Sequence, residues 1–486
     1  MLLSQAAQVL GGRQVGTDVK FAAVSSDSRT VAAGDLFVAL RGENFDGAEF
    51  VAGAAQAGAV AALVHTGASI AATPPCPLLL VEDTRLALGR LAAYWRAQFA
   101  VPVVAVTGSN GKTTVKEMLA SILREAAEGV DAVLATTGNL NNDIGMPLTL
   151  LKLRGNHRYA VIEMGMNHPG EIAYLSRLAR PDVAVINNAA SAHLAGLGSV
   201  EAVARAKGEI LEGLPDHGIA VINADDFYAP LWREQAGGRT TIGFGLKQDA
   251  AVRAQWRPHG SGAEVEVNTP QGNFTVLLQV PGAHNARNAL AAVAAALALR
   301  VGLPAIAAGL EKFAGVAGRL QRKAALRGAT LIDDSYNANP ASVHAALEVL
   351  AQAEGRKILV LGDMGELGSS ALRLHQEIGA EARRLGVDSL WALGELTLRA
   401  AREFGAGARH FERIEDLLAA LDHDLGTGDT VLVKGSRFMR MERVVAHCVG
   451  EEKREGGRGK SGAAGGYYPS PLPLPPSQDC KEQKCC

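Results

Sequence analysis

VVAVTGSNGKTT, at residues 103–114, joins an apolar run, a glycine-bearing turn and the start of a helix. Residues 101–106 are typical of a buried strand and residues 114–127 of an amphipathic helix, so the stretch predicts a strand–turn–helix unit of an α/β sheet. Glycines let backbone N–H groups surround an anion, and the positive end of the helix dipole lies at the same turn. We therefore expect a nucleotide phosphate there. The residues expected to hold it are Gly108, Ser109, Asn110, Gly111, Lys112, Thr113 and Thr114.

The match to the usual P-loop pattern is partial, because Val106 stands where that pattern has its first glycine. A tight strand-to-helix turn without a ligand would also contain glycines. It would not need the lysine and the two threonines that follow them, so we interpret the turn as a binding site. Lys112, as an exposed loop lysine, would contribute positive charge, and Thr113 would offer its hydroxyl to Mg²⁺.

Composition and charge narrow the class of protein. The 48 basic and 50 acidic residues give a net charge of −2, and the absence of a basic stripe argues against nucleic acid as a partner. The five cysteines lack metal-site spacing and do not indicate a disulfide scaffold. The N-terminus lacks the basic lead and the long apolar run of a signal peptide or membrane span. We expect a cytoplasmic enzyme without membrane insertion.

The chain length of 486 residues suggests about three domains. Residues 1–98 predict a small α/β domain, and residues 99–315 alternate strands and helices as in a doubly wound, mainly parallel sheet. Within the second range, residues 251–280 predict an antiparallel extension. Residues 316–449 predict a smaller α/β domain, whereas the composition of residues 450–486 is that of a disordered tail.

Polar residues stand where predicted parallel strands end, which is where open α/β sheets bind ligands. Glu163 ends one strand and is suited to hold Mg²⁺. His193 follows another strand and is either a metal ligand or a hydrogen-bonded structural residue. Lys207 lies on a helix expected over residues 200–213, and its simplest interpretation is a solvated lysine.

Several polar loops allow a binding role or a plain structural one. Residues 25–29 could bind a substrate or form a hydrated turn, and residues 136–147 form an ordered binding loop or a surface loop. Asn285 and Asn288 share one helix face, where they either read an adenine edge or cap the helix. Three further loops of the third range converge on one sheet edge and suggest a second half-site: residues 333–340, 362–368 and 434–437.

In combination, these segments resemble the Mur ligases over residues 1–449. The motifs that carry the resemblance are TGSNGKTT at 107, TTGNLNNDIGMPLTLL at 136, EMGMNHPGEI at 163, NNAASAHLAGLGS at 187, ARAKGEI at 204, PGAHNARNALAA at 281, DDSYNANP at 333, LGDMGELG at 361 and LVKGSRFMRME at 432. The resemblance implies a UDP-sugar domain at 1–98, an ATP domain at 99–315 and a Rossmann-like domain for the incoming dipeptide at 316–449.

The resemblance also implies an activity, which is the ATP-dependent addition of D-alanyl-D-alanine to UDP-N-acetylmuramoyl-tripeptide in peptidoglycan precursor synthesis. The peptide carboxylate would take the γ-phosphoryl group of ATP to form an acyl phosphate, and the dipeptide amine would then displace phosphate. Two Mg²⁺ ions would neutralise charge, and domain closure would exclude water. We expect a monomer.

The family's residue roles fall on matching positions of this sequence. Lys112 would hold ATP phosphates, Thr113 and Glu163 one Mg²⁺, and His193 the second, while Lys207 would be carbamylated. The remaining expected contacts are Asn285 and Asn288 with the adenine side, Arg319 and Asp334 with phosphate and ribose, and Ser28, Arg29, Asn139 and Asn142 with the UDP-muramoyl peptide.

Three alternatives stay open. Two share the fold, namely the ligase that adds the third residue of the muramoyl peptide and folylpolyglutamate synthetase. The absence of an Asp-Asn-Pro-Arg segment, of the kind that selects diaminopimelate, favours the dipeptide-adding activity. The third is a P-loop ATPase or binding module, which would hydrolyse nucleotide without a UDP-sugar. The sequence does not distinguish lysine from diaminopimelate as the third residue of the accepted peptide.

Overall fold

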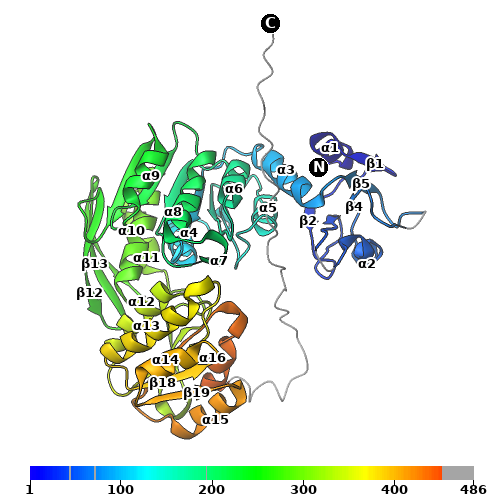
Figure 1. The fold of residues 1–486 in the computed structure, drawn as a ribbon. Coiled ribbons are helices and arrows are strands. Elements are labelled where there is room, and N and C mark those ends of the chain that lie inside the picture. The colour runs from blue at the N-terminus through cyan, green and yellow to red at the C-terminus, as the bar shows by residue number, and fades with distance from the viewer. Residues whose placement is uncertain (43–44, 71–72, 193, 451–486) are drawn as a thin grey trace.

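The computed structural model describes residues 1–42, 45–70, 73–192 and 194–450, so His193 and the residues after 450 lie outside the described chain. It has three sheets with helices packed on them, which confirms the expected α/β class. In Figure 1 the N-terminal sheet, in blue, lies beside one end of the central layer, and the C-terminal sheet, in yellow to orange, lies below that layer. No helix of the described ranges is long and apolar enough to cross a membrane.

The N-terminal sheet has five strands in the order β1-β5-β4-β3-β2, and β1 alone is antiparallel to its neighbour. Asp83 begins the helix that leads to the central sheet, because its carboxylate accepts hydrogen bonds from the backbone N–H groups of Arg85 and Leu86. The elements are α1 Leu3–Leu10, β1 Arg13–Val15, β2 Ala23–Ser25, β3 Asp35–Val38, α2 Val51–Ala57, β4 Ala61–His65, β5 Leu78–Val81 and α3 Thr84–Arg96.

The central sheet has nine strands in the order β14-β13-β12-β11-β10-β9-β6-β8-β7. The antiparallel extension expected at 251–280 is present as β12, β13 and β14. The elements are β6 Val103–Thr107, α4 Lys112–Ala126, β7 Val133–Ala135, α5 Gly145–Leu150, β8 Tyr159–Glu163, α6 Glu171–Ala179, β9 Val183–Ile186, α7 Leu194–Leu197, α8 Val200–Gly208, β10 Ile219–Asn223, α9 Ala229–Ala236, β11 Thr240–Gly245, β12 Val252–His259, β13 Gly262–Thr269, β14 Gly272–Leu278, α10 Ala283–Ala298 and α11 Leu303–Glu311.

Both faces of the central sheet are covered, as the continuous apolar run of β6 requires. Val104 and Val106 face α4, α10 and α11, whereas Val103 and Ala105 face the opposite core with α3, α5, α6, α8 and α9. β6 lies between the parallel strands β9 and β8, so the turn that follows it lies at the carboxyl ends of these strands.

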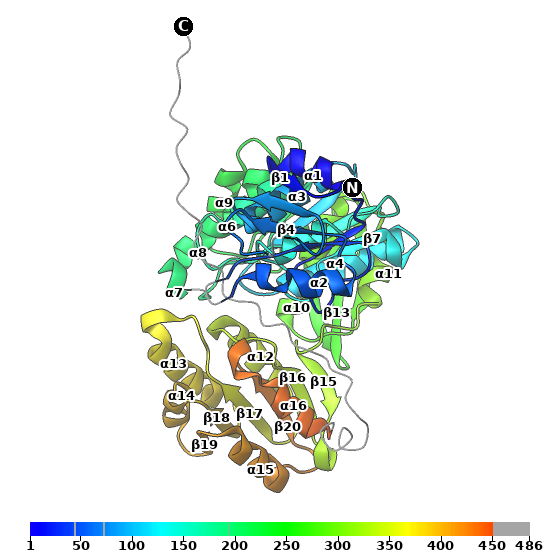
Figure 2. The same cartoon turned by 90° about the vertical axis from the view of Figure 1, so that its right-hand side faces the viewer.

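The C-terminal sheet has six strands in the order β15-β16-β20-β17-β18-β19, all parallel except the edge strand β15. Figure 2 shows it as a separate body beneath the other two sheets. The elements are β15 Gln321–Ala324, β16 Thr330–Asp334, α12 Pro340–Ala351, β17 Lys357–Gly362, α13 Ala371–Arg384, β18 Ser389–Leu393, α14 Thr397–Phe404, β19 Ala408–Phe411, α15 Ile414–Asp424, β20 Thr430–Lys434 and α16 Glu442–Val449.

One predicted helix differs from the structure. The helix expected over residues 200–213 is α8 followed by a 3₁₀ turn, η3, at Glu209–Gly213. A Cβ at Gly213 would lie 2.1 Å from the carbonyl oxygen of Ser176, and the Ser176 hydroxyl donates a hydrogen bond to the carbonyl of Ile210. This close approach to α6 tightens the last turn, which residue periodicity does not predict.

Candidate active site

The turn after β6 requires glycine at the start of α4. Gly111 has φ +78°, and a Cβ there would lie 2.4 Å from Oδ1 of Asn288 and 2.6 Å from Nδ2 of Asn187. Asn187 also donates to the carbonyl of Asn110 at 2.9 Å. The turn therefore packs against Asn187, the residue after β9, and against Asn288 of α10.

Lys112 is half-buried, so the expectation of an exposed loop lysine is wrong. Its ammonium donates to the carbonyl of Gly108 at 2.7 Å and lies 3.5 Å from that of Ser109. Burial lowers the pKa of Lys112. The negative charges of Glu163 and Glu366 oppose this change, whereas the positive charge of Arg319 adds to it. Charged residues of the central domain and of the C-terminal domain thus lie near this lysine.

A hydroxyl and a carboxylate meet beside Lys112. Thr113 Oγ1 donates to Oε2 of Glu163 at 2.8 Å, and Glu163 is only 2 % exposed. The strand register explains the meeting, because Val106 of β6 pairs with Glu163 at the end of β8. Asn141 holds the second oxygen through Nδ2, at 2.7 Å. Hydroxyl and carboxylate oxygens are the hard donors that Mg²⁺ prefers, so these residues fit that ion.

Lys207 is 1 % exposed, so its interpretation as a solvated lysine is wrong. Burial lowers its pKa well below the ordinary value, and the nearby charge of Lys112 lowers it further. His193, the other expected ligand, lies outside the described residues. Within the described ranges, no three His, Cys, Asp or Glu side chains are grouped so as to hold a metal ion.

Asn285 and Asn288 are both buried and lie against the turn. Asn288 accepts from Asn187 at 3.0 Å and donates to Asn285 at 3.3 Å, while Asn285 donates to the carbonyl of Pro281 at 2.8 Å. In this structure the two amides brace the start of α10 and the turn before α4. Their expected contact with adenine stays a prediction.

Arg319 reaches the same point from the interdomain joint. Its Nη2 donates to Thr113 Oγ1 at 2.9 Å, and its guanidinium lies 4.4 Å from the ring centre of Tyr336. Asp334, by contrast, is buried against Lys434, with Oδ2 2.5 Å from Nζ. Burial raises the pKa of Asp334, and Lys434 opposes that change.

The expected substrate residues are spread over two elements. Ser28 and Arg29 lie after β2 in the N-terminal domain, where Arg29 pairs with Asp27 at 2.6 Å. Asn142 caps α5 by accepting from the N–H of Gly145 at 2.8 Å, and Asn139 is exposed on the same loop. The roles of these four residues in binding the UDP-muramoyl peptide stay predictions.

The loop at 136–147 connects the N-terminal domain to the site. Asp143 forms a two-pronged ion pair with Arg85 of α3, while Asn141 bonds Glu163. Sequence reasoning selected Asn139 and Asn142 and missed Asn141. All three lie in one polar stretch, and only the folded loop determines which side chain turns inward.

Sequence reasoning selected the loops at 333–340 and 362–368 as a half-site but assigned no individual role to three of their residues. Asn339 donates to Oδ1 of Asn110 at 2.8 Å, and the carbonyl of Glu366 accepts from the N–H of Ala195 at 3.1 Å. Tyr336 is close enough to Glu163 for that carboxylate to raise its pKa, after the larger effect of burial. The sequence signal that could have identified these residues is their position in loops that follow parallel strands.

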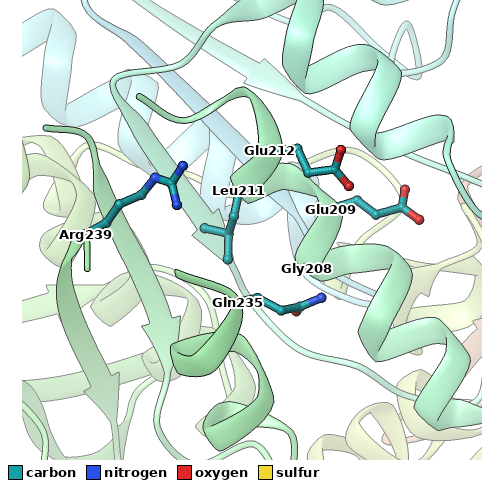
Figure 3. A pocket seen from close by; sticks show the side chains of 6 residues that line it. All are labelled: Gly208, Glu209, Leu211, Glu212, Gln235 and Arg239. Carbon is teal, nitrogen blue, oxygen red and sulfur yellow. The ribbon is translucent and has the colours of Figure 1, made fainter. Parts of the chain in front are cut away.

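A separate hollow lies between η3 and α9 (Figure 3). Its polar side chains are engaged in the fold, because Glu209 accepts from the N–H of Gly170 and Arg239 donates to the carbonyls of Leu214 and Pro215. The lining consists of Gly208, Glu209, Leu211, Glu212, Gln235 and Arg239. None of these is a residue of the site described above.

A glycine turn between a parallel strand and a helix, with a lysine, a hydroxyl and a carboxylate, is typical of P-loop phosphate sites. Three family descriptions match the chain in order. They are "Mur ligase family, catalytic domain" at residues 20–96, "Mur ligase middle domain" at 106–296 and "Mur ligase, glutamate ligase domain" at 318–437.

Individual relatives agree. The chain is 43 % identical to the UDP-N-acetylmuramoyl-tripeptide–D-alanyl-D-alanine ligase of Escherichia coli (strain K12), covering 91 % of this chain and 97 % of that one. A crystal structure of MurF from Acinetobacter baumannii matches with a TM-score of 0.84 and 39 % identity, over 91 % and 97 % of the chains. MurF ligase from Thermotoga maritima, in complex with ADP, matches with 0.78 and 30 %, over 89 % and 98 %. The chain belongs to the Mur ligase family.

Proposed function

We propose that this protein is an ATP-dependent ligase that joins D-alanyl-D-alanine to UDP-N-acetylmuramoyl-tripeptide. The observation that carries the proposal is the meeting of two domains at Thr113, whose hydroxyl contacts both Glu163 of the central sheet and Arg319 of the interdomain joint. Relatives that bear this activity in their names match the chain over nearly its whole length.

We propose that each of the three domains binds one of the three substrates. Residues 1–98 take the UDP-sugar, residues 99–315 take ATP, and residues 316–449 take the dipeptide. The contacts that join them support this division, since Arg85 of the first unit bonds Asp143 of the second, and Asn339 of the third bonds Asn110 of the second. Because one chain supplies every unit, we propose a monomer, acting in the cytoplasm where ATP is available.

The residues perform phosphoryl transfer by neutralising charge. Lys112 and Arg319 balance the negative charge that develops on the transferred phosphoryl group. Thr113 and Glu163 hold Mg²⁺, which, when bound, stabilises charge on phosphate oxygens. The product of this step is an acyl phosphate on the tripeptide, and closure of the third unit keeps water from it.

Lys207 has a distinct proposed role. Its burial favours the neutral amine, which is the form that adds CO₂ to give a carbamate. The carbamate is an anion with two oxygen donors, suited to a second Mg²⁺ together with His193. Asn285 and Asn288 then lie on the adenine side, Asp334 at the ribose, and Ser28, Arg29, Asn139 and Asn142 along the UDP-muramoyl peptide.

The test is ADP release with UDP-N-acetylmuramoyl-tripeptide, with and without D-alanyl-D-alanine, supported by the mass of the product. We expect ADP and the extended peptide only when ATP, the UDP-tripeptide and the dipeptide are all present. If the protein instead adds diaminopimelate or lysine to a UDP-muramoyl-dipeptide, it is the ligase that adds the third residue. If it extends a folate, it is a folylpolyglutamate synthetase. ATP hydrolysis independent of any UDP-sugar would support an ATPase module. Parallel assays with the lysine and the diaminopimelate tripeptide identify the accepted third residue.

A further inference from the structure

The loop at 362–368 follows β17 and is held on both sides within the C-terminal domain. The N–H of Met364 donates to Nε2 of His375 at 2.9 Å, and the N–H of Gly365 donates to the hydroxyl of Ser436 at 2.8 Å. These bonds fix the backbone that carries Glu366, so the direction of that residue is determined by the fold of its own domain.

Glu366 itself has an unusual backbone and makes an interdomain contact. Its φ is +61°, a left-handed conformation that residues other than glycine seldom adopt. Its carbonyl accepts from the N–H of Ala195, and Gly368 lies against the same alanine of the central domain. Strained positions of this kind are held by their surroundings and occur at functional sites.

The side chain of Glu366 is exposed, and its backbone lies at the contact with the central domain. Its charge is felt at Lys112, where it opposes the pKa-lowering effect of burial. A carboxylate from the domain assigned to the dipeptide is thus near the lysine assigned to the phosphates. On the proposed function, the acyl phosphate and the incoming amine meet between these two domains.

The chemistry at that place requires a group that accepts a proton. The dipeptide amine is an ammonium at neutral pH, and it has no lone pair for attack until a proton leaves. We propose that Glu366 binds this ammonium and accepts its proton. This inference rests on the proposed function. One ammonium proton passes to the Glu366 carboxylate, and the freed nitrogen lone pair forms the N–C bond. The C–O bond to phosphate then breaks with its electron pair leaving on phosphate, which takes the second N–H proton.

The chain offers a matched control. Gly365-Glu366-Leu367 follows β17, and the same tripeptide, Gly394-Glu395-Leu396, follows the neighbouring strand β18. Glu395 is exposed as well, and it lacks the contact with Ala195. Glu395→Gln therefore makes the same chemical change at the same edge of the same sheet.

The test uses two acceptors with ATP and UDP-N-acetylmuramoyl-tripeptide. D-alanyl-D-alanine needs a base, whereas hydroxylamine is unprotonated at neutral pH and traps the acyl phosphate as a hydroxamate. We expect Glu366→Gln to lose about 10²–10⁴-fold in kcat for ligation. Hydroxamate formation and the KM for ATP should stay near wild type. Glu366→Asp should restore part of the ligation, and Glu395→Gln should match wild type in both assays.

Two outcomes would overturn the assignment. Equal loss of ligation and hydroxamate formation in Glu366→Gln would mean that the side chain only supports the domain contact. Ligation at the wild-type rate would mean that Glu366 takes no part in proton transfer. Failure of the unmodified protein to form either product contradicts the proposed function instead, so the two failures are distinguishable.

Discussion

At the carboxyl edge of the central sheet, Thr113 and Glu163 are buried and hydrogen-bonded to each other, and the buried Asn288 accepts a hydrogen bond from Asn187. At the facing edge of the C-terminal sheet, by contrast, Glu366 and Phe438 are exposed. The first edge is prearranged, as phosphate binding and charge neutralisation require. On the proposed function, the exposed side chains of the second edge would be covered when substrates bind and the domains close. The comparison predicts that substitutions at the central edge cost more activity than substitutions of interdomain contacts.

The largest effect is expected at Lys112. Lys112→Ala should lower kcat/KM for ADP release by at least about 10²–10³-fold, because it removes the ammonium held at the turn. The melting temperature should change little, since the ammonium bonds only nearby carbonyls. Steady-state ADP release with circular dichroism melting checks both. Unchanged turnover would remove the phosphate site from the central edge.

The next largest effect is expected at Lys207, where two variants distinguish the charge of the side chain from its size. Lys207→Ala should be nearly inactive and partly restored by small carboxylates that fill the vacated space. Lys207→Arg should be inactive without rescue, because guanidinium keeps its positive charge and forms no carbamate. Activity with and without added acetate or formate measures this. Near-normal turnover of Lys207→Arg would contradict the carbamate.

Burial of Lys207 also predicts a pH-dependent stability. Its pKa is lowered in the folded protein, so the unfolded chain binds a proton that the folded chain does not, and stability rises with pH until the ordinary pKa of 10.5. Lys207→Met removes this dependence, which has a limiting slope of roughly 1.4 kcal/mol per pH unit. Urea unfolding in metal-free, CO₂-free buffer should show the variant more stable at pH 7, with the difference shrinking toward pH 10. An equal difference at all pH values would mean that Lys207 stays charged.

The smallest effect is expected at the interdomain contact of Asn339. Asn339→Ser keeps an oxygen that caps α12 but removes the amide that bonds Asn110. We expect a fall in kcat/KM of about 10-fold or less, consistent with one hydrogen bond, and a nearly unchanged melting temperature. A loss as large as that of Lys112→Ala would contradict the comparison of the two edges.

The fold followed from the sequence where the pattern was long and periodic. The strand before Gly108, the helix after Gly111 and the antiparallel strands at 251–280 all have clear periods. The edge strand β15, with the sequence QRKA, was missed because its side chains are polar and half-exposed. The tightened turn η3 was missed because it depends on contact with Ser176.

The sequence predicted a role with Mg²⁺ for Thr113, after the glycine turn, and for Glu163, at the end of a parallel strand, and the family resemblance assigned both residues to one ion. Sequence motifs could not show that Lys207 is buried, because the segment ARAKGEI is equally compatible with an exposed helix face. Nor could they show that Asn141 turns inward while Asn142 caps α5. These features depend on tertiary packing, which no local pattern encodes.

The most direct test of the central claim labels the terminal carboxylate of UDP-N-acetylmuramoyl-tripeptide with ¹⁸O and follows the label during ligation. If the carboxylate attacks the γ-phosphate of ATP, the oxygen that bridges carbon and phosphorus leaves with phosphate. Mass spectrometry should then find one ¹⁸O in the inorganic phosphate and one in the new amide. Phosphate without ¹⁸O, alongside normal product formation, would contradict an acyl-phosphate ligase.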